Sequence, residues 1–235
     1  MPRAVRHPAQ AVSPAVTVTY YVEVLSSWCH WAEPAWTALK QRYPDRVHFE
    51  RRIALMRPTD FPHSREQCDW FYQRSGLHVR SPIMLHSGWL EPERAGHYEA
   101  PNFVAEAARQ LGKTPDDDHV RLALTHAAVR EGRRIGDLDT AVKIAATASG
   151  LAPARLKRAA ESAAVRDVVH NSTAAFHAMQ LTQRPAFVVE SVIGDKAMFS
   201  GVWQAAPLIA TIDGMLEDAA SYAAHAAHHP PLPSA

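Results

Sequence analysis

The chain has 235 residues, with 25 Lys and Arg side chains against 24 Asp and Glu, and a formal net charge of +1. A near-neutral chain lacks the basic excess with which nucleic-acid-binding proteins contact phosphates, so we expect no nucleic-acid partner. The two cysteines, Cys29 and Cys68, are too few for a disulfide framework and do not have metal-ligand spacing. The histidines also lack Cys or carboxylate partners at ligand spacing, so we predict no metal site.

Both ends of the chain, residues 1–15 and 229–235, contain prolines and show no periodicity. We therefore expect flexible termini. The first segment lacks the apolar centre of a secretion signal, and no stretch approaches the roughly 18 consecutive apolar residues of a membrane span. These observations predict a cytoplasmic protein without a membrane partner, in a compartment where thiols stay reduced.

A strand, a polar corner and a helix follow one another near the start of the chain. Residues 16–25 are β-branched and aromatic, as in a buried strand, and the corner 26–30 leads into a helix predicted over 33–43. Residues 47–55 alternate as a second strand. Cys29 is thereby placed at the start of a helix, where free N–H groups and the helix dipole favour a thiolate.

The pattern is helical from about residue 59 to residue 180. Glycines at 112, 132 and 150 stand where helices should end, and residues 114–118 have the sequence of a capped helix start. After residue 185 two strands and an alanine-rich helix are predicted. The predicted helices of the block are 102–111, 117–131, 139–149, 154–164 and 167–180, and the closing elements are 186–190, 196–200 and 205–228.

This order of elements predicts an α/β fold, in which a thioredoxin-like core carries a large inserted all-helical domain. The core is expected to comprise residues 16–58 and 181–228, and the insertion residues 59–180.

The sequence resembles the DsbA-like branch of the thioredoxin superfamily, in particular the cytoplasmic group with the 2-hydroxychromene-2-carboxylate isomerases and kappa-class glutathione transferases. The resemblance covers about residues 17–222, and three segments carry it: 24–29, 131–151 and 184–201. In that family the proline before the third strand is cis and faces the active-site corner. The resemblance thus implies a cis-Pro185, glutathione as a cofactor, and a homodimer, because relatives are often dimeric.

The corner departs from the Cys-x-x-Cys of redox relatives, in which the first thiolate attacks and the second thiol resolves the mixed disulfide. Two alignments are open. In Ser26-Ser27-Trp28-Cys29 a serine takes the attacking position, whereas in Cys29-His30-Trp31-Ala32 an alanine replaces the resolving cysteine. We prefer the first, because Val24-Leu25 precedes Ser26 as the strand end precedes the first cysteine in relatives.

Cys29 and Ser26 are the predicted catalytic residues. Isomerase and transferase relatives place at the position of Ser26 a serine that stabilises a glutathione thiolate, although a serine at a corner also serves as a plain N-cap. Cys29 is either a reactive thiol or a buried structural one, and Cys68 is expected in the core. The predicted substrate- or thiol-binding residues are Ser27, Trp28, His30, Trp31, Arg184 and Pro185.

Arg184 has three interpretations that the sequence leaves open. Its guanidinium could hold a substrate carboxylate in bidentate fashion, pair with a Cys29 thiolate, or reach solvent as a surface side chain.

Three functional hypotheses follow. The first is a DsbA-like thiol-disulfide oxidoreductase with a single-cysteine site, working with glutathione or another small thiol, or on protein disulfides. The second is a glutathione-dependent isomerase or transferase that uses Ser26, and the third is a thioredoxin-like binding module without catalysis. A substrate pocket is expected where the core meets the inserted helices. The enzymatic hypotheses place Cys29 and Pro185 on opposite sides of one groove.

Overall fold

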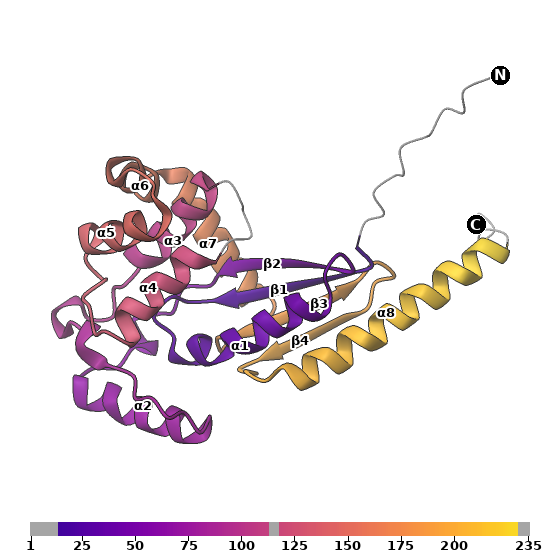
Figure 1. The fold of residues 1–235 in the computed structure, drawn as a ribbon, viewed down its shortest axis with the longest axis horizontal. Helices are drawn as coiled ribbons and strands as arrows, with labels where there is room; N and C mark the ends of the chain where they lie inside the picture. The colour runs from indigo at the N-terminus through magenta and orange to yellow at the C-terminus, as the bar shows by residue number, and fades with distance from the viewer. Residues whose placement is uncertain (1–13, 113–117, 230–235) are drawn as a thin grey trace.

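A four-stranded mixed sheet, with the strand order β2-β1-β3-β4, forms the centre of the computed structural model (Figure 1). Strand β1 (Val16–Val22) pairs parallel with β2 (Val47–Ile53) and antiparallel with β3 (Ala186–Ser191). Strand β4 (Lys196–Ser200) pairs antiparallel with β3 and forms the other edge. Strands β1, β2 and β4 lie within the predicted segments, and β3 runs one residue past its predicted end at residue 190. The predicted α/β fold with a thioredoxin-like core and a helical insertion is confirmed.

The structure describes residues 14–112 and 118–229. The capped helix start predicted at 114–118 therefore lies outside the described residues, except for its last residue, and so does most of both predicted flexible termini. Within the described part, no helix has the length and apolar character needed to cross a membrane.

Helices α1 (Ser27–Arg42) and α8 (Ala205–His228) lie side by side on one face of the sheet, and α8 extends past the end of the strands (Figure 1). The aromatic rings of Tyr20 and Phe187 stack on this face at 4.6 Å, and Trp36 packs against both. The alternation of side chains along β1 and β3 thus provides one apolar layer for α1 and α8.

Helix α1 begins six residues before its predicted start, because Ser26 caps it. The Ser26 backbone is extended, and its Oγ accepts a hydrogen bond from the N–H of Cys29 at 3.3 Å. Such a cap satisfies one of the N–H groups that have no partner within a helix, so the whole corner becomes helical. Pro34 consequently lies inside the helix instead of at its start.

Between β2 and the last helix of the insertion, the described residues form five helices. Four of them, α3 to α6, pack together at the end of the sheet, and α2 lies apart from them, next to α1 (Figure 1). Their bounds are α2 (Arg65–His78), α3 (Ala100–Leu111), α4 (His119–Val129), α5 (Leu138–Ser149) and α6 (Pro153–Ala160), with single 3₁₀ turns at Pro58–Asp60, Ser87–Trp89 and Pro92–Arg94.

Helix α7 (Ala163–Ala178) begins earlier than predicted and packs against the sheet. The Oγ of Ser162 accepts from the N–H of Val165, which starts α7 three residues after α6 ends. Phe176 of α7 packs against Tyr21 on the face of the sheet that α1 leaves free. The boundary between core and insertion remains a prediction. Helix α7 covers the sheet of the core, whether it is counted with the core or with the insertion.

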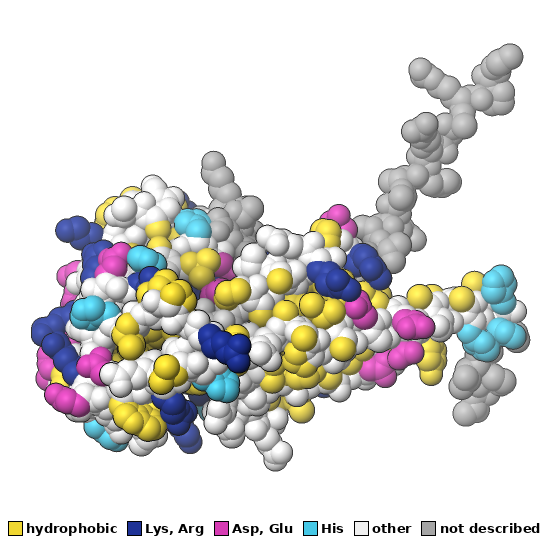
Figure 2. All heavy atoms as spheres, turned by 60° about the horizontal axis from the view of Figure 1, so that its bottom comes forward, with side chains coloured by type: hydrophobic (Ala, Val, Ile, Leu, Met, Phe, Trp, Pro, Cys, Tyr) yellow, Lys and Arg dark blue, Asp and Glu magenta, His cyan; other side chains and the backbone are white. Residues whose placement is uncertain are grey.

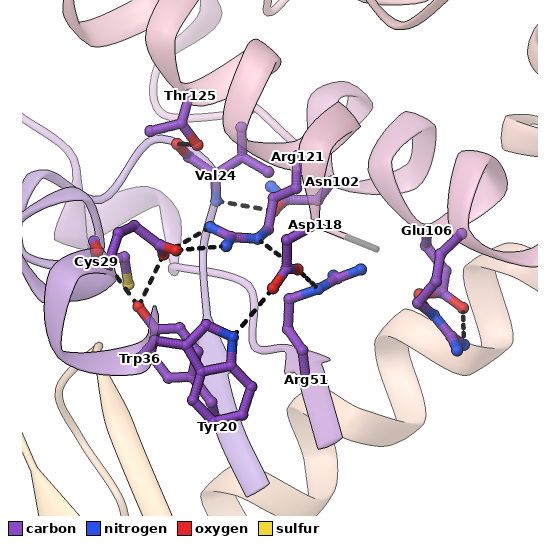
Figure 3. Close-up of polar contacts among 12 residues, drawn as sticks. Tyr20, Val24, Cys29, Trp36, Arg51, Asn102, Glu106, Asp118, Arg121 and Thr125 are labelled. Carbon is purple, nitrogen blue, oxygen red and sulfur yellow. Dashed lines mark hydrogen bonds and ion pairs between the residues drawn. The ribbon is translucent and has the colours of Figure 1, made fainter. Parts of the chain in front are cut away.

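A buried chain of charges joins the insertion to the core (Figure 3). Arg121 of α4 donates two hydrogen bonds of 2.8 Å to the carboxylate of Glu33 on α1, and its Nε lies 3.3 Å from Asp118. Asp118 also pairs with Arg51 of β2 and accepts from the indole N–H of Trp36 at 3.0 Å. These contacts fix α4 against both α1 and β2.

Replacing Arg121 by Met should destabilise the fold strongly, because it leaves the buried Glu33 without its guanidinium partner. Breaking one half of such a pair costs about 3–5 kcal/mol. The loss is measured as the change in the free energy of unfolding in urea. The exposed pair of Lys157 and Asp139, 2.6 Å apart, supplies the control. Lys157→Met should change stability little, since water screens that pair. Similar small losses for both variants would contradict the role given to Arg121.

Candidate functional site

A groove of about 340 Å³ lies between the core and helix α2, where the sequence analysis expects a pocket. Three parts of the chain form it: the start of α1, the segment before β3, and one face of α2 with neighbouring loops. The lining residues are Leu25, Ser26, Ser27, Trp28, Met56, Asp60, Pro62, Cys68, Phe71, Tyr72, Arg74, Trp89, Thr182, Gln183 and Arg184.

Ser26 lies in this groove at the N-terminus of α1. Its side chain accepts from the N–H of Cys29, and its own N–H donates to the carbonyl of Glu23 at 3.2 Å. The same hydroxyl also makes a side-chain hydrogen bond with Cys29, so it donates to a ligand in the groove by turning its hydrogen away from that sulfur. The N–H groups of Ser27 and Trp28 open the helix and have no carbonyl partner within it. The corner thus offers hydrogen-bond donors to an anion.

Cys29 is not part of the groove. Its side chain is 1% exposed and belongs to the hydrophobic core. Burial raises the pKa of its thiol to about 12, although the hydrogen bond with Ser26 acts in the opposite direction. The thiolate expected from the helix terminus is therefore not favoured, because desolvation of the charged form outweighs the helix dipole. The expectation that Cys29 faces Pro185 across a groove is corrected too: the groove contains Ser26 and Arg184 instead.

The segment before β3 contains a cis peptide bond between Arg184 and Pro185. The guanidinium of Arg184 is buried: its Nε donates to the carbonyl of Ala54 at 2.7 Å, and its Nη2 donates to that of Leu55. Asp60 lies 3.6 Å from the same group. Arg184 is therefore not a solvent-directed arginine, and its guanidinium is already hydrogen-bonded within the protein.

The remaining predicted residues divide between the groove and its surroundings. Trp28 lines the groove, with its ring 5.7 Å from that of His78. Trp31 faces away and donates from its indole nitrogen to the Oγ of Ser75 at 3.1 Å, which ties α1 to α2. Desolvation, together with the charge of nearby Arg130, lowers the pKa of His30 to about 4, so this ring is neutral at pH 7. Neither Trp31 nor His30 lines the groove.

Cys68 lies in the core, as the sequence analysis expects, with no exposed surface, and it contributes to the floor of the groove. Burial raises the pKa of its thiol to about 12. The described residues thus place no ionised thiol in the groove at neutral pH, and they contain no group of three metal-binding side chains.

Glu23 is a site residue that the sequence analysis missed. Its carboxylate is buried beside the corner and accepts hydrogen bonds from the N–H of Leu25 at 2.7 Å and from Nδ2 of Asn102 at 2.5 Å. Burial raises its pKa to about 7, despite these hydrogen bonds. A single acid at the end of an apolar strand, three residues before Ser26, was the available signal.

The raised pKa makes the folded protein bind a proton at Glu23 that the unfolded chain releases near pH 4.5. The contribution of Glu23 to the free energy of unfolding is therefore fully present below pH 4.5 and is lost as the pH rises to about 7. With about 1.4 kcal/mol for each pH unit, the loss by pH 8 is about 3 kcal/mol.

Titration of the Glu23 side-chain carboxyl by carbon NMR should show a midpoint near pH 7, and Glu23→Gln should remove that signal. His30 acts in the opposite direction between about pH 4 and 6.5, because its folded pKa is lowered. The informative quantity is therefore the difference in unfolding free energy between the wild type and Glu23→Gln across this range. A titration midpoint near pH 4.5 would contradict the raised pKa of Glu23.

Three comparisons relate the chain to known proteins. No family model and no curated protein sequence matches it. Among solved structures, it is similar to a putative protein disulfide isomerase from Nitrosomonas europaea, with 16% identity, a TM-score of 0.69, and coverage of 86% of this chain and 98% of that one. The cytosolic disulfide reductase DsbM from Pseudomonas aeruginosa gives 16% identity, a TM-score of 0.65 and the same coverage.

DsbA from Pseudomonas aeruginosa is 15% identical, with a TM-score of 0.54 and coverage of 95% of this chain and 91% of that chain. At such identities the likeness concerns the fold. The chain therefore has the fold of the DsbA-like branch of the thioredoxin superfamily, a thioredoxin-like core interrupted by a helical insertion.

Proposed function

We propose that the protein is a glutathione-dependent isomerase or transferase, in which the sulfur of a bound small thiol is the reacting group. One observation carries this proposal: Ser26 lines the groove at the start of α1, whereas Cys29 does not line it and its thiol is buried in the core. The protein then supplies the environment for a nucleophile that it does not itself contain.

The start of α1 is suited to a thiolate. Ser26 can donate its hydroxyl hydrogen to sulfur, and the N–H groups of Ser27 and Trp28 point out of the helix beside it. Helix α1 has 16 residues, and its first turn contains no acidic side chain that would repel an anion. A sulfur held here is stabilised in its charged form, so its pKa falls.

Glu23 is placed to take part in the proton balance of such a thiol. It lies next to the N-cap, and its pKa of about 7 is that of a group which exchanges protons at neutral pH. Asn102 of α3 holds the carboxylate, and it also accepts from the N–H of Val24 through its Oδ1 at 3.2 Å. The inserted helices therefore orient the acid beside the site.

The walls of the groove fit a small apolar second substrate. Trp28, Phe71 and Trp89 contribute aromatic surface, and the volume of about 340 Å³ is typical of small-molecule sites. Arg74 adds a positive charge, with its guanidinium 5.9 Å from the ring of Phe71. The resemblance implies that the backbone of the residue before the cis-proline pairs with a substrate or with glutathione, and Arg184 holds that position here.

A thiol-disulfide oxidoreductase is the second candidate, because the names of the similar structures include a disulfide reductase and a putative disulfide isomerase. Such an activity, on a small thiol or a protein disulfide, would require Cys29 to become accessible. A cytoplasmic location and a homodimer, both expected from the resemblance, belong to the same proposal. A binding module without catalysis would keep the groove and use neither thiol.

Ser26→Ala should weaken glutathione binding by about tenfold and raise the pKa of the bound thiol by about one unit, because a hydrogen bond to a charged acceptor is lost. The thiolate absorbance of glutathione near 240 nm, followed against pH with excess protein, measures this pKa. Ser162→Ala is the matched control, since Ser162 also caps a 16-residue helix through a 3.3 Å hydrogen bond. Both variants lose about 1 kcal/mol of stability, and only Ser26→Ala should change the thiol. Equal effects on the thiol would refute the proposal.

The reactivity of the Cys29 thiol distinguishes the two candidate activities. In the native protein Cys29 should react with iodoacetamide at pH 7 more slowly than free cysteine, since its raised pKa leaves little thiolate. The rate is followed by mass spectrometry, with the urea-unfolded chain as the reference for full reactivity. Cys29→Ser should retain glutathione binding and the shifted thiol pKa. Fast alkylation in the native protein would instead favour the oxidoreductase.

A further inference from the structure

A second cavity, of about 410 Å³, lies in the helical insertion and is lined by positively charged side chains. It is bounded by α3, α4, α6, the end of α5 and one residue of β2. The arginines on its wall are Arg51, Arg109, Arg121 and Arg155, and His119 lies among them. Its described lining contains no Asp or Glu, and the remaining wall consists mostly of alanine, leucine and valine side chains.

Arg51 lies on the wall of this cavity and carries a donor that has no partner among the described residues. Its side chain is only 6% exposed, and its Nε is paired with Asp118. Its Nη1 is buried and has no hydrogen-bond partner within residues 14–112 and 118–229. A buried N–H group without an acceptor is costly, so such a group points to an absent partner.

The carboxylates near Arg51 are already occupied. Asp118 is shared with Arg121 and with Lys40, which lies 3.6 Å away. The next acid, Glu106, accepts two hydrogen bonds, of 2.8 and 2.6 Å, from Arg109. Figure 3 shows both acids engaged, one on each side of Arg51. Burial and the proximity of Arg121 lower the pKa of Arg51, although Asp118 opposes this effect. Among the described residues, the four arginines of the wall therefore outnumber the three carboxylates that pair with them, Glu33, Glu106 and Asp118.

We propose that this cavity binds a small organic anion, with its carboxylate on Arg51 and Arg155 and its apolar body against α3 and α4. Guanidinium groups bind carboxylates through paired, charge-assisted hydrogen bonds. The apolar part of the wall favours a ligand that carries a hydrocarbon body over a bare inorganic ion. The site lies apart from the groove at Ser26 and does not depend on the function proposed for that groove.

Calorimetric titration of the full chain with hexanoate, acetate and inorganic phosphate at constant ionic strength tests the proposal. Hexanoate has the head group of acetate and four additional carbons, so it should bind more than tenfold more tightly, at about 0.8 kcal/mol for each buried methylene. Phosphate should bind more weakly than hexanoate. Hexanoate that binds no more tightly than acetate, or more weakly than phosphate, would overturn the proposal.

Three substitutions test whether hexanoate binds in this cavity. Arg155→Glu reverses an exposed charge at the rim of the cavity and should weaken hexanoate binding by about tenfold or more. Arg158→Glu makes the same change on the same helix outside the cavity and should leave the affinity unaltered. Arg51→Lys removes the unused donor and should abolish binding. If that variant does not fold, the two α6 variants decide, and equal affinities for them would refute the site.

Discussion

The bidentate pair between Arg121 and Glu33 is the interaction on which the arrangement of the two parts of the molecule depends. It joins α4 of the insertion to α1 of the core, and Asp118 extends it to β2 through Arg51. Burying a charged group without a partner is costly, so each side chain of the pair is stable in its position only while the other is present. Each of the two cavities has part of its wall on a helix that this pair joins: Ser27 and Trp28 of α1 line the groove, and Arg121 of α4 lines the second cavity.

The β-branched and aromatic residues of β1 predicted a buried strand, and both β1 and β3 contribute side chains to the core on each face of the sheet. The helix starts were less predictable, since Ser26 and Ser162 act as caps only through a hydrogen bond that the local sequence does not specify. The chain of charges was not predicted either. Glu33, Arg51 and Arg121 lie far apart in the sequence, and nothing in their spacing indicates that they meet.

At the site, the sequence located the corner correctly and misjudged the chemistry of its sulfur. The position of Cys29 in the first turn of α1 suggested a thiolate, but this position also directs the side chain toward the core, where Tyr20 and Trp36 lie. The helix dipole is worth at most about 2 kcal/mol, and burial of an ion costs more than that. Arg184 illustrates the same limit. Its role depends on the carbonyls of residues 54 and 55, about 130 residues earlier in the chain.

The cap at the start of α1 also selects the kind of atom that the corner can receive. Since the oxygen of Ser26 already accepts from the N–H of Cys29, the hydroxyl can act toward a ligand as a donor once its hydrogen turns away from the Cys29 sulfur. The neighbouring backbone presents hydrogens as well. An ammonium or a guanidinium at the corner would face hydrogen-bond donors, to which it cannot bond. An anion, which carries lone pairs, can accept hydrogen bonds from several of them. The corner therefore discriminates against cations before any side chain of the groove makes contact.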